Sequence, residues 1–363
     1  MPLEVNRIIF WQPIDSPHQE AFLEAVAEQF AGEVILGVEQ GLPAERVAQG
    51  WQKAVHKKVK VVDISIPANH VALAAHSSAD SLHVFTGFFS HPLVWSGFRK
   101  LAPSQARLAI MSEAPEQPLL TGWLKRFRGG VLARRWAQRF AFVLAIGGIG
   151  CEFFEAIGFP KEKIIPFGYY LDVPPLVAIE ADKQHGGVFR FISAGQLIHR
   201  KGIDILIKAC SQLPATGWRL DIYGDGPERA SLERLAAQIK LTDRITFHGA
   251  VPNTEVHNAL AAADCAVLPS RFDGWGMLVN EALAVGTPVV CAPRCGAAAL
   301  LAESFAGEIV RCSNAECLAA AMRSIFKGNP ISGTTRSSVR AIAVAHSASG
   351  AAGHFMAAIA GVS

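Results

Sequence analysis

Residues 270–290 read SRFDGWGMLVNEALAVGTPVV, and this stretch decides the fold. It follows an apolar run at Cys265–Leu268 that has the length and composition of a buried strand. A loop over Pro269–Gly276 leads into a predicted helix at Met277–Val285, and Thr287–Cys291 begins the next strand. Glycines stand at the helix entrance, where free backbone N–H groups and the helix dipole favour an anion.

Two carboxylates flank this helix entrance. Asp273 lies in the loop and Glu281 lies one turn inside the helix, so we expect both to face one ligand whose phosphate lies at the helix start. An ordinary glycine-rich connection with a solvated Asp and Glu has the same composition, because short glycine motifs often occur by chance. The rest of the chain decides between these interpretations.

Alternating strand and helix patterns on both sides of this stretch predict parallel, doubly wound sheets. In the first half, a helix pattern at Pro17–Phe30 and others separate six predicted strands: Ile8–Trp11, Val34–Val38, Val59–Ile64, His83–Thr86, Leu108–Met111 and Phe142–Ile146. The alternation breaks over Pro166–Val188, which is rich in Pro, Gly and charge. It then restarts with strands at Phe189–Ser193, Arg219–Tyr223 and Ile245–Phe247 and helices at Ile203–Gln212 and Glu228–Ile239.

The predicted fold is therefore α/β, with two doubly wound, Rossmann-like domains. We assign residues 1–170 to the first domain, 171–187 to a linker and 188–335 to the second domain. Residues 336–363 form a C-terminal helix that we expect to pack back on the first domain. Residues 341–363 carry no charged side chain, but they are mostly Ala, Gly and Ser, which favours a packed helix over a membrane span.

Composition excludes several classes of protein. The 363 residues are half hydrophobic and 18% charged, as in well-packed globular proteins. A net charge of +3 is far below that of a dedicated nucleic-acid binder. The N-terminus lacks the pattern of a secretory leader, and the seven cysteines lack the spacing of a zinc site. We therefore expect a reducing, cytoplasmic setting and small buried cysteines.

The loops after the strands of the second domain collect groups that suit a nucleotide diphosphate. Ligands of open parallel sheets bind beyond the carboxyl ends of the strands. In this position stand AGQLIHRKG, GDGPE, HGAVPN and the loop before Met277. Cations and backbone N–H groups are suited to phosphates, and a carboxylate is suited to ribose hydroxyls.

The order of these motifs resembles the retaining nucleotide-sugar glycosyltransferases with two Rossmann domains, family four, also called group 1. The resemblance rests on GQLIHRKG, DIYGDGPE, FHGAV and ALAAADCAVLPSRFDGWGMLVNEALAVGTPVV, and it covers about residues 189–310. The first domain matches more weakly, through SPHQ, HVFTG and MSEAP. The resemblance implies the GT-B fold, in which two domains face a central cleft.

The resemblance also implies roles for individual residues. Glu281 would hold the ribose hydroxyls, and Asp273 stands where the family usually has Glu, near the transferred sugar. Lys201, with Arg200, would neutralise the departing diphosphate. Gln196 replaces the family's first Arg, so Arg200 would supply that charge. The nucleotide-sugar site would further include Gly195, Gly224, Gly226, His248, Gly249, Val251, Gly274, Trp275, Gly276, Met277 and Leu278.

The first domain is expected to hold the acceptor. Its candidate groups are Glu113, as a catalytic carboxylate at a strand end, and His18 at the start of a helix, although either side chain also fits an exposed loop or first turn. No acidic residue lies between Glu116 and Glu152. Cations and aromatics alternate there, which suits an anionic membrane surface as well as a solvated helix face. We assign Arg126 and Arg128 of this stretch to acceptor binding.

These observations predict a cytoplasmic, retaining hexosyltransferase, at the inner face of the membrane, that uses a UDP- or GDP-sugar and a lipid-linked or surface-polysaccharide acceptor. No two aspartates stand two positions apart, so we expect no metal and no other cofactor. The nucleotide sugar is a co-substrate, and nucleic acid is not a partner. Two alternatives stay open, namely a nucleotide-sugar 2-epimerase of the same architecture and a non-catalytic nucleotide-sugar-binding partner.

Overall fold

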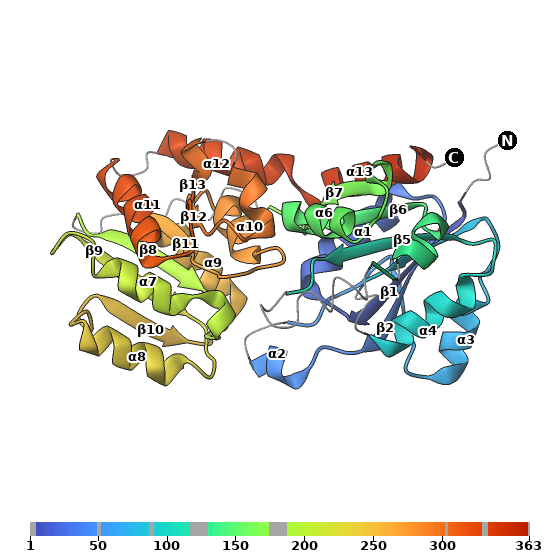
Figure 1. Cartoon of the computed structure of the whole chain (residues 1–363), viewed down its shortest axis with the longest axis horizontal. Coiled ribbons are helices and arrows are strands. Elements are labelled where there is room, and N and C mark those ends of the chain that lie inside the picture. Colours follow the sequence, from blue (N-terminus) through green and yellow to red (C-terminus); the bar gives the residue numbers. More distant parts are fainter. Residues whose placement is uncertain are drawn as a thin grey trace. The chain divides into compact units, whose positions relative to one another are not determined.

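The computed structural model describes residues 5–48, 52–86, 91–116, 130–131, 133–173, 187–301, 304–328 and 333–361. The chain divides into two compact α/β units (Figure 1). The first comprises Met1–Ala44, Gln52–Tyr170 and Ala348–Ser363. The second comprises Glu45–Trp51 and Leu171–Ser347.

The first unit contains a sheet of seven parallel strands in the order β3-β2-β1-β4-β5-β6-β7. The strands are β1 (Arg7–Ile14), β2 (Glu33–Gln40), β3 (Lys60–Asp63), β4 (Ser81–Phe85), β5 (Arg107–Glu113), β6 (Phe142–Ile146) and β7 (Ile164–Phe167). Its helices include α1 (Pro17–Gln29), α3 (Pro67–Ala74), α4 (Pro92–Leu101), α6 (Gly147–Ala156) and α13 (Ala348–Gly361). Helix α2 (Ala44–Ala48) belongs to the second unit except for its first residue, Ala44. The continuous apolar runs follow from burial of the central strands on both faces, as Ile8–Trp11 shows with 0% exposure.

Helix α13 packs against α1 within the first unit (Figure 1). Phe355 of α13 is fully buried, and its ring lies 5.7 Å from those of Phe10 and Phe22 and 6.3 Å from that of Phe142. By length and composition, Arg336–Gly361 is also apolar enough to cross a membrane. The burial of Phe355 shows instead that this end of the segment completes the core of the first unit.

The second unit contains six parallel strands in the order β10-β9-β8-β11-β12-β13. The strands are β8 (Phe189–Ala194), β9 (Trp218–Tyr223), β10 (Ile245–Gly249), β11 (Cys265–Leu268), β12 (Val289–Cys291) and β13 (Gly307–Ile309). Its helices include α7 (Ile203–Cys210), α8 (Arg229–Gln238), α9 (Asn253–Ala262), α10 (Met277–Ala284), α11 (Ala315–Lys327) and α12 (Gly333–Ala345). Helices α7, α8 and α11 form one group and α9, α10 and α12 another (Figure 1).

Two arginines fix α12 to the ends of α9 and α10. The Arg336 guanidinium donates hydrogen bonds to the carbonyls of Ala261 and Ala263, at 3.2 and 2.7 Å. Arg340 donates to the carbonyl of Ala284 at 2.8 Å. Cations at helix C-termini satisfy unpaired carbonyls and complement the helix dipole. Since α10 carries the candidate phosphate site at its other end, this contact helps to fix its position.

One boundary expected from the sequence needs correction, and one strand was missed. Pro166 was placed in the irregular segment before the second domain, but Ile164–Phe167 forms strand β7, which pairs with β6. The short strand β13 was not predicted at all, because three residues carry too little periodicity. Most of the predicted linker, 174–186, lies outside the described residues.

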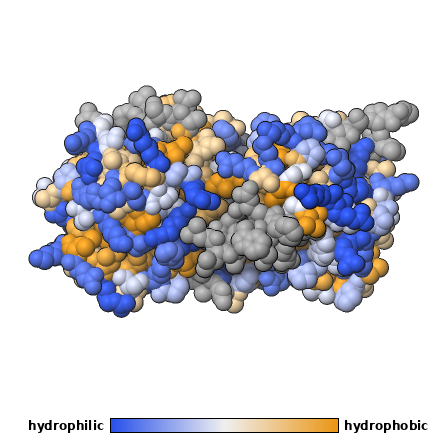
Figure 2. Space-filling model, viewed as in Figure 1, coloured by the Kyte–Doolittle hydropathy of each residue, from blue (hydrophilic) through white to orange (hydrophobic). Residues whose placement is uncertain are grey.

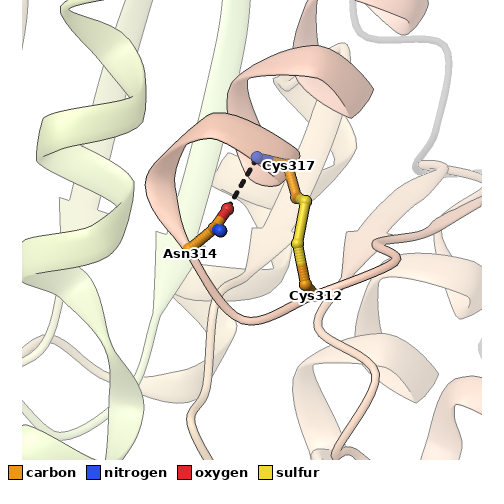
Figure 3. The surroundings of a disulfide bond; sticks show 3 residues. All are labelled: Cys312, Asn314 and Cys317. Atoms are coloured by element: carbon orange, nitrogen blue, oxygen red, sulfur yellow. Dashed lines mark hydrogen bonds between the residues drawn. A yellow bond between two sulfur atoms is a disulfide. The ribbon is translucent and has the colours of Figure 1, made fainter.

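The expectation of small buried cysteines is wrong for one pair. Cys312 and Cys317 form a disulfide with a Cα–Cα distance of 5.9 Å (Figure 3). Neither is fully buried, and the Asn314 side chain between them accepts a hydrogen bond of 2.8 Å from the Cys317 amide. This N-cap turns the chain so that the two sulfurs meet at the start of α11. Cys210, Cys265, Cys291 and Cys295 are buried free thiols, as expected.

Large hydrophobic side chains that remain exposed are scattered over both units. On the face in Figure 2, hydrophilic and hydrophobic residues are interspersed. The exposed large hydrophobics are Val47, Val55, Val61, Ile66, Val71, Val131, Phe305, Ile309 and Val344. Single exposed side chains of this kind are normal for globular proteins.

Candidate functional site

The candidate site lies at the point where the chain of the second unit reverses its direction across the sheet. From β8 the strands proceed to β9 and β10 on one side, and from β11 to β12 and β13 on the other. Strands β8 and β11 are neighbours, so the loops that leave their carboxyl ends diverge. Such a switch point is the usual ligand site of open α/β sheets, and we call the edge where the loops after β8 and β11 diverge the crevice.

Lys201, Arg200 and Asp273 meet at this crevice, from loops 72 residues apart. The Lys201 ammonium lies 2.6 Å from Asp273 Oδ2, and the Arg200 guanidinium lies 3.6 Å from Oδ1. The Arg200 guanidinium also donates to the carbonyl of Phe272 at 3.0 Å. The side chains of both cations stay partly accessible, with 19% exposure for Lys201 and 28% for Arg200. Two cations against one carboxylate leave a net positive charge, which suits an anionic group.

A second ion pair fixes the loop that carries Asp273. Arg271 forms a bidentate contact with Asp204 of α7, with distances of 2.7 and 2.8 Å. The Arg271 backbone N–H donates to the carbonyl of Arg200 at 2.9 Å. Paired guanidinium–carboxylate bonds define orientation as well as distance. The sequence analysis missed this pair, although an arginine two positions before Asp273 was a visible signal.

The entrance of α10 has the geometry that phosphate binding requires. Gly276 is the N-cap residue with φ 99°, a conformation that other residues rarely adopt. A Cβ at this position would lie 2.5 Å from Cys295 Sγ and 2.7 Å from Leu268 Cδ2. Glycine therefore lets the loop pass close to the core, and its lack of a side chain leaves the first amides of α10 without a side-chain cap.

Backbone hydrogen bonds fix the Gly274–Met277 loop against the loop that follows β12. The Asp273 amide donates to the Arg294 carbonyl at 2.9 Å, and the Ala297 amide donates to the Trp275 carbonyl at 2.8 Å. The Trp275 indole is 4% exposed and donates to Asn280 at 2.7 Å. Trp275 and Leu278 thus contribute their side chains to the core, which leaves backbone groups for any ligand.

The glycines after β8 and β9 allow two loops to touch through their backbones. The Gly195 amide donates to Tyr223 and the Leu197 amide donates to Asp225, both at 3.0 Å. At Gly224, φ is 115° and an added Cβ would lie 1.9 Å from the Gly195 carbonyl oxygen. At Gly226 an added Cβ would lie 2.5 Å from the Leu197 oxygen. Gly224 and Gly226 therefore hold the Gly195–Gln196 loop in place as well as turning the chain.

The predicted residues at the carboxyl end of β10 lie at the same edge of the sheet. His248 is exposed, and its Nε2 lies 2.7 Å from Asp221 Oδ1. Its ring stacks on that of Tyr223 at 4.2 Å with an angle of 3°. Gly249 and Val251 follow directly and lead into α9. The sequence analysis did not identify the ring pair, because it depends on the register of β9 against β10.

Glu281 lies in the second turn of α10, where its side chain is 15% exposed. The imidazole of His257, on α9, lies 3.7 Å from Glu281 Oε1. The nearby Glu281 carboxylate raises the pKa of His257 above its usual value. Glu281 is therefore a largely buried carboxylate with a basic partner, as buried charges generally require.

In the first unit, Glu113 is the last residue of β5, and His18 lies in the first turn of α1, which follows β1. Glu113 ends β5 and accepts a hydrogen bond from Tyr169, whose pKa is raised by burial and by the nearby Glu113 carboxylate. Gln19, next to His18 in the first turn of α1, also bonds to Tyr169. Glu113 thus belongs to a polar cluster at the carboxyl ends of β1 and β5.

The basic stretch of the first unit is only partly described. Arg126 and Arg128 lie outside the described residues. Arg139, another cation of this stretch, donates to the carbonyls of Ala102, Ser104 and Ala106 at 2.7–2.8 Å. Its guanidinium caps the C-terminal end of α4, so this cation is not available to a membrane surface.

The match to a known protein family covers mainly the second unit. Residues 179–341, which include the whole crevice, match the family model Glycosyl transferases group 1. The putative colanic acid biosynthesis glycosyltransferase WcaL of Salmonella typhimurium is 32% identical over 191 residues, 50% of this chain and 47% of WcaL. A GDP-mannose-dependent phosphatidylinositol dimannoside mannosyltransferase of Mycobacterium tuberculosis is 33% identical over 186 residues, 46% of this chain and 48% of that protein. The chain spans about half the length of these curated relatives.

Solved structures match over nearly the full length. HepE of Anabaena, in complex with UDP and glucose, superposes with a TM-score of 0.73 and 17% identity, covering 98% of this chain and 99% of HepE. WaaG, a glycosyltransferase involved in lipopolysaccharide biosynthesis, gives a TM-score of 0.61 and 17% identity over 97% of this chain and 98% of WaaG. The chain has the GT-B fold. The architecture predicted from the sequence is confirmed.

Proposed function

We propose that the protein is a retaining glycosyltransferase that moves a hexose from a nucleotide-diphosphate sugar to a lipid-linked or surface-polysaccharide acceptor. The observation that carries this proposal is the meeting of Lys201 and Arg200 with Asp273 beside the open entrance of α10. The family match of residues 179–341 and the names of the relatives support the same reaction class.

In this proposal, the diphosphate lies at the start of α10 and beside the two cations. Loss of the sugar leaves negative charge on the diphosphate, and fixed positive groups stabilise that charge most when it develops. Asp273 holds the Lys201 ammonium in place before the nucleotide arrives. Since Lys201 and Arg200 supply the positive charge, the proposed reaction requires no metal ion.

The donor is proposed to be a UDP- or GDP-sugar. HepE was solved with UDP, and the mycobacterial relative is described as GDP-mannose-dependent, so both bases occur among the similar proteins. Glu281 would accept hydrogen bonds from the ribose hydroxyls, which are common to both nucleotides. The choice between uracil and guanine would then depend on the side chains at the carboxyl ends of β9 and β10, where Tyr223 and His248 stack.

The acceptor is proposed to bind the first unit, at a membrane surface on the cytoplasmic side. The exposed cations Arg134 and Arg135 support this setting. Sedimentation with anionic vesicles tests it, because wild type should pellet at low salt more than a variant with Lys125, Arg126 and Arg128 changed to Ser. Equal pelleting would indicate a soluble acceptor.

Thermal unfolding with a panel of UDP-, GDP- and ADP-sugars tests the nucleotide site. A ligand at 100 times its Kd stabilises the native state by about 2.7 kcal/mol, so one class should raise the Tm clearly. Glu281→Gln should reduce that rise by weakening binding about 10-fold or more, on the scale of lost charged hydrogen bonds. Glu316→Gln, an exposed position on α11, is the control. No rise with any nucleotide sugar would contradict the proposal.

A further inference from the structure

His257 lies close enough to the carboxylate of Glu281 to orient it. Helices α9 and α10 pack together within the second unit, and His257 Nε2 faces Glu281 Oε1 at 3.7 Å. The Glu281 side chain is 15% exposed and that of His257 is 43% exposed. The carboxylate is thus largely buried, and the imidazole paired with it is the more exposed of the two groups.

We propose that His257 is a positioning residue of the nucleotide site, pairing with Glu281 so that this carboxylate is held in the orientation that meets the ribose hydroxyls. This inference rests on the proposed function, because it assumes that Glu281 binds ribose. It assigns to His257 a role in affinity for the nucleotide and none in the bond-breaking step, since the imidazole acts only through Glu281.

The physical reason lies in the length of the glutamate side chain. A free Glu has three rotatable bonds, and fixing them costs free energy each time a ligand binds. A partner that fixes the rotamer beforehand removes this cost from binding. His257 meets this requirement because it comes from a different helix and therefore does not move with the Glu281 side chain.

The pair should make nucleotide affinity depend on pH. The Glu281 carboxylate beside the imidazole is the largest cause of the raised pKa of His257. The pKa is raised above 6.5, so the stabilising ion pair is fully present below pH 6.5. It is lost as the pH rises through the raised value, where the imidazole becomes neutral. Affinity that depends on Glu281 should decline over the same range.

The test is isothermal calorimetry with two nucleotides at pH 6 and pH 8. One is UDP or GDP, whichever stabilises the wild type, and the other is its 2′,3′-dideoxy form, which lacks the hydroxyls that Glu281 would bind. The phosphates of both titrate alike, so the difference between them isolates the ribose contact. The variants are His257→Gln and, as a control, His346→Gln, at an exposed histidine directly after α12.

At pH 6, His257→Gln should weaken binding of the ordinary nucleotide by about fivefold, the upper range for a partly exposed ion pair. It should leave the dideoxy form unchanged. The affinity difference between the two nucleotides should fall from pH 6 to pH 8 in wild type and in His346→Gln, and stay constant in His257→Gln.

Two results would overturn the inference. Equal weakening of both nucleotides by His257→Gln would show a general structural role, and an unchanged affinity for both would show no role. Either leaves the nucleotide site itself intact. Failure of the wild type to bind UDP or GDP at all is a separate result that would contradict the proposed function.

Discussion

At the scale of single residues, the central feature is the shared carboxylate of Asp273. Its two oxygens face Lys201 at 2.6 Å and Arg200 at 3.6 Å. The sequence identified all three residues but assigned the cations to phosphate and the carboxylate to sugar. It could not show that they touch, because contacts across 72 residues depend on how β8 and β11 pair.

Lys201→Ala is expected to lower turnover about 100-fold, as for a lost transition-state contact, and to change donor affinity much less. The reason is that charge on the leaving diphosphate develops during the reaction. Steady-state kinetics with a saturating donor measures this effect, with Lys327→Ala at the exposed end of α11 as the control. Normal turnover of Lys201→Ala would assign the leaving-group role to another residue.

A second residue-scale prediction concerns the stability of the first unit. Buried His83 accepts a hydrogen bond from the Trp11 indole at Nδ1, and its Nε2 lies 2.7 Å from the His76 carbonyl oxygen. Burial lowers its pKa from 6.5 to about 4. Between pH 6.5 and pH 4 the unfolded state therefore protonates this imidazole and the folded state does not. The free energy of unfolding is unaffected by this group above pH 6.5 and falls as the pH drops toward 4.

Urea unfolding of wild type should lose on the order of 3 kcal/mol between pH 6.5 and pH 4 through this histidine. His83→Asn should be less stable at pH 7 but should show a smaller loss over the same range. His346→Asn should behave as wild type. Parallel pH curves for wild type and His83→Asn would show that the buried imidazole does not carry the dependence.

At the scale of elements, local patterns predicted what lies within one helix or strand. Helix α10 begins at Met277 as predicted and ends one residue earlier, because Gly276 and Gly286 punctuate it in the sequence. Features built from distant segments escaped prediction, including the capping of α4 by Arg139. The sequence alone does not show whether an arginine side chain is solvated or caps the end of a distant helix.

The loop between β9 and α8 gives a prediction at this scale. Gly224→Ala should destabilise the second unit by about 1–3 kcal/mol for the backbone strain alone, since φ is 115° and the Cβ meets the Gly195 oxygen. Nucleotide binding should weaken too, because the Gly195–Gln196 loop must shift. Thermal unfolding and calorimetry measure both effects.

The matched control is Gly328→Ala, in the same unit. Gly328 has φ −80°, and its nearest neighbour, the Ser324 carbonyl oxygen, would lie at an ordinary 3.4 Å from the new Cβ. That variant should change stability by about 0.5 kcal/mol or less. Similar behaviour of the two variants would mean that the close approach of the two loops is not required.

At the scale of the whole molecule, the two units have separate cores, and the chain end at α13 belongs to the first. Phe355→Ala should therefore cost about 3–5 kcal/mol of stability, as for other buried aromatics, in the unfolding of the first unit. The nucleotide affinity of the second unit should remain. Calorimetric scans with and without UDP or GDP separate the two transitions, and a loss of nucleotide affinity would contradict this separation.

The central claim is that the second unit presents a nucleotide sugar for transfer. Product analysis with one labelled donor, chosen from the thermal-shift panel, tests it most directly when an acceptor-containing membrane fraction is supplied. The account predicts release of the nucleoside diphosphate and transfer of the labelled sugar to the acceptor with its anomeric configuration retained. Label recovered as an isomerised nucleotide sugar, or as bound donor without turnover, would contradict it.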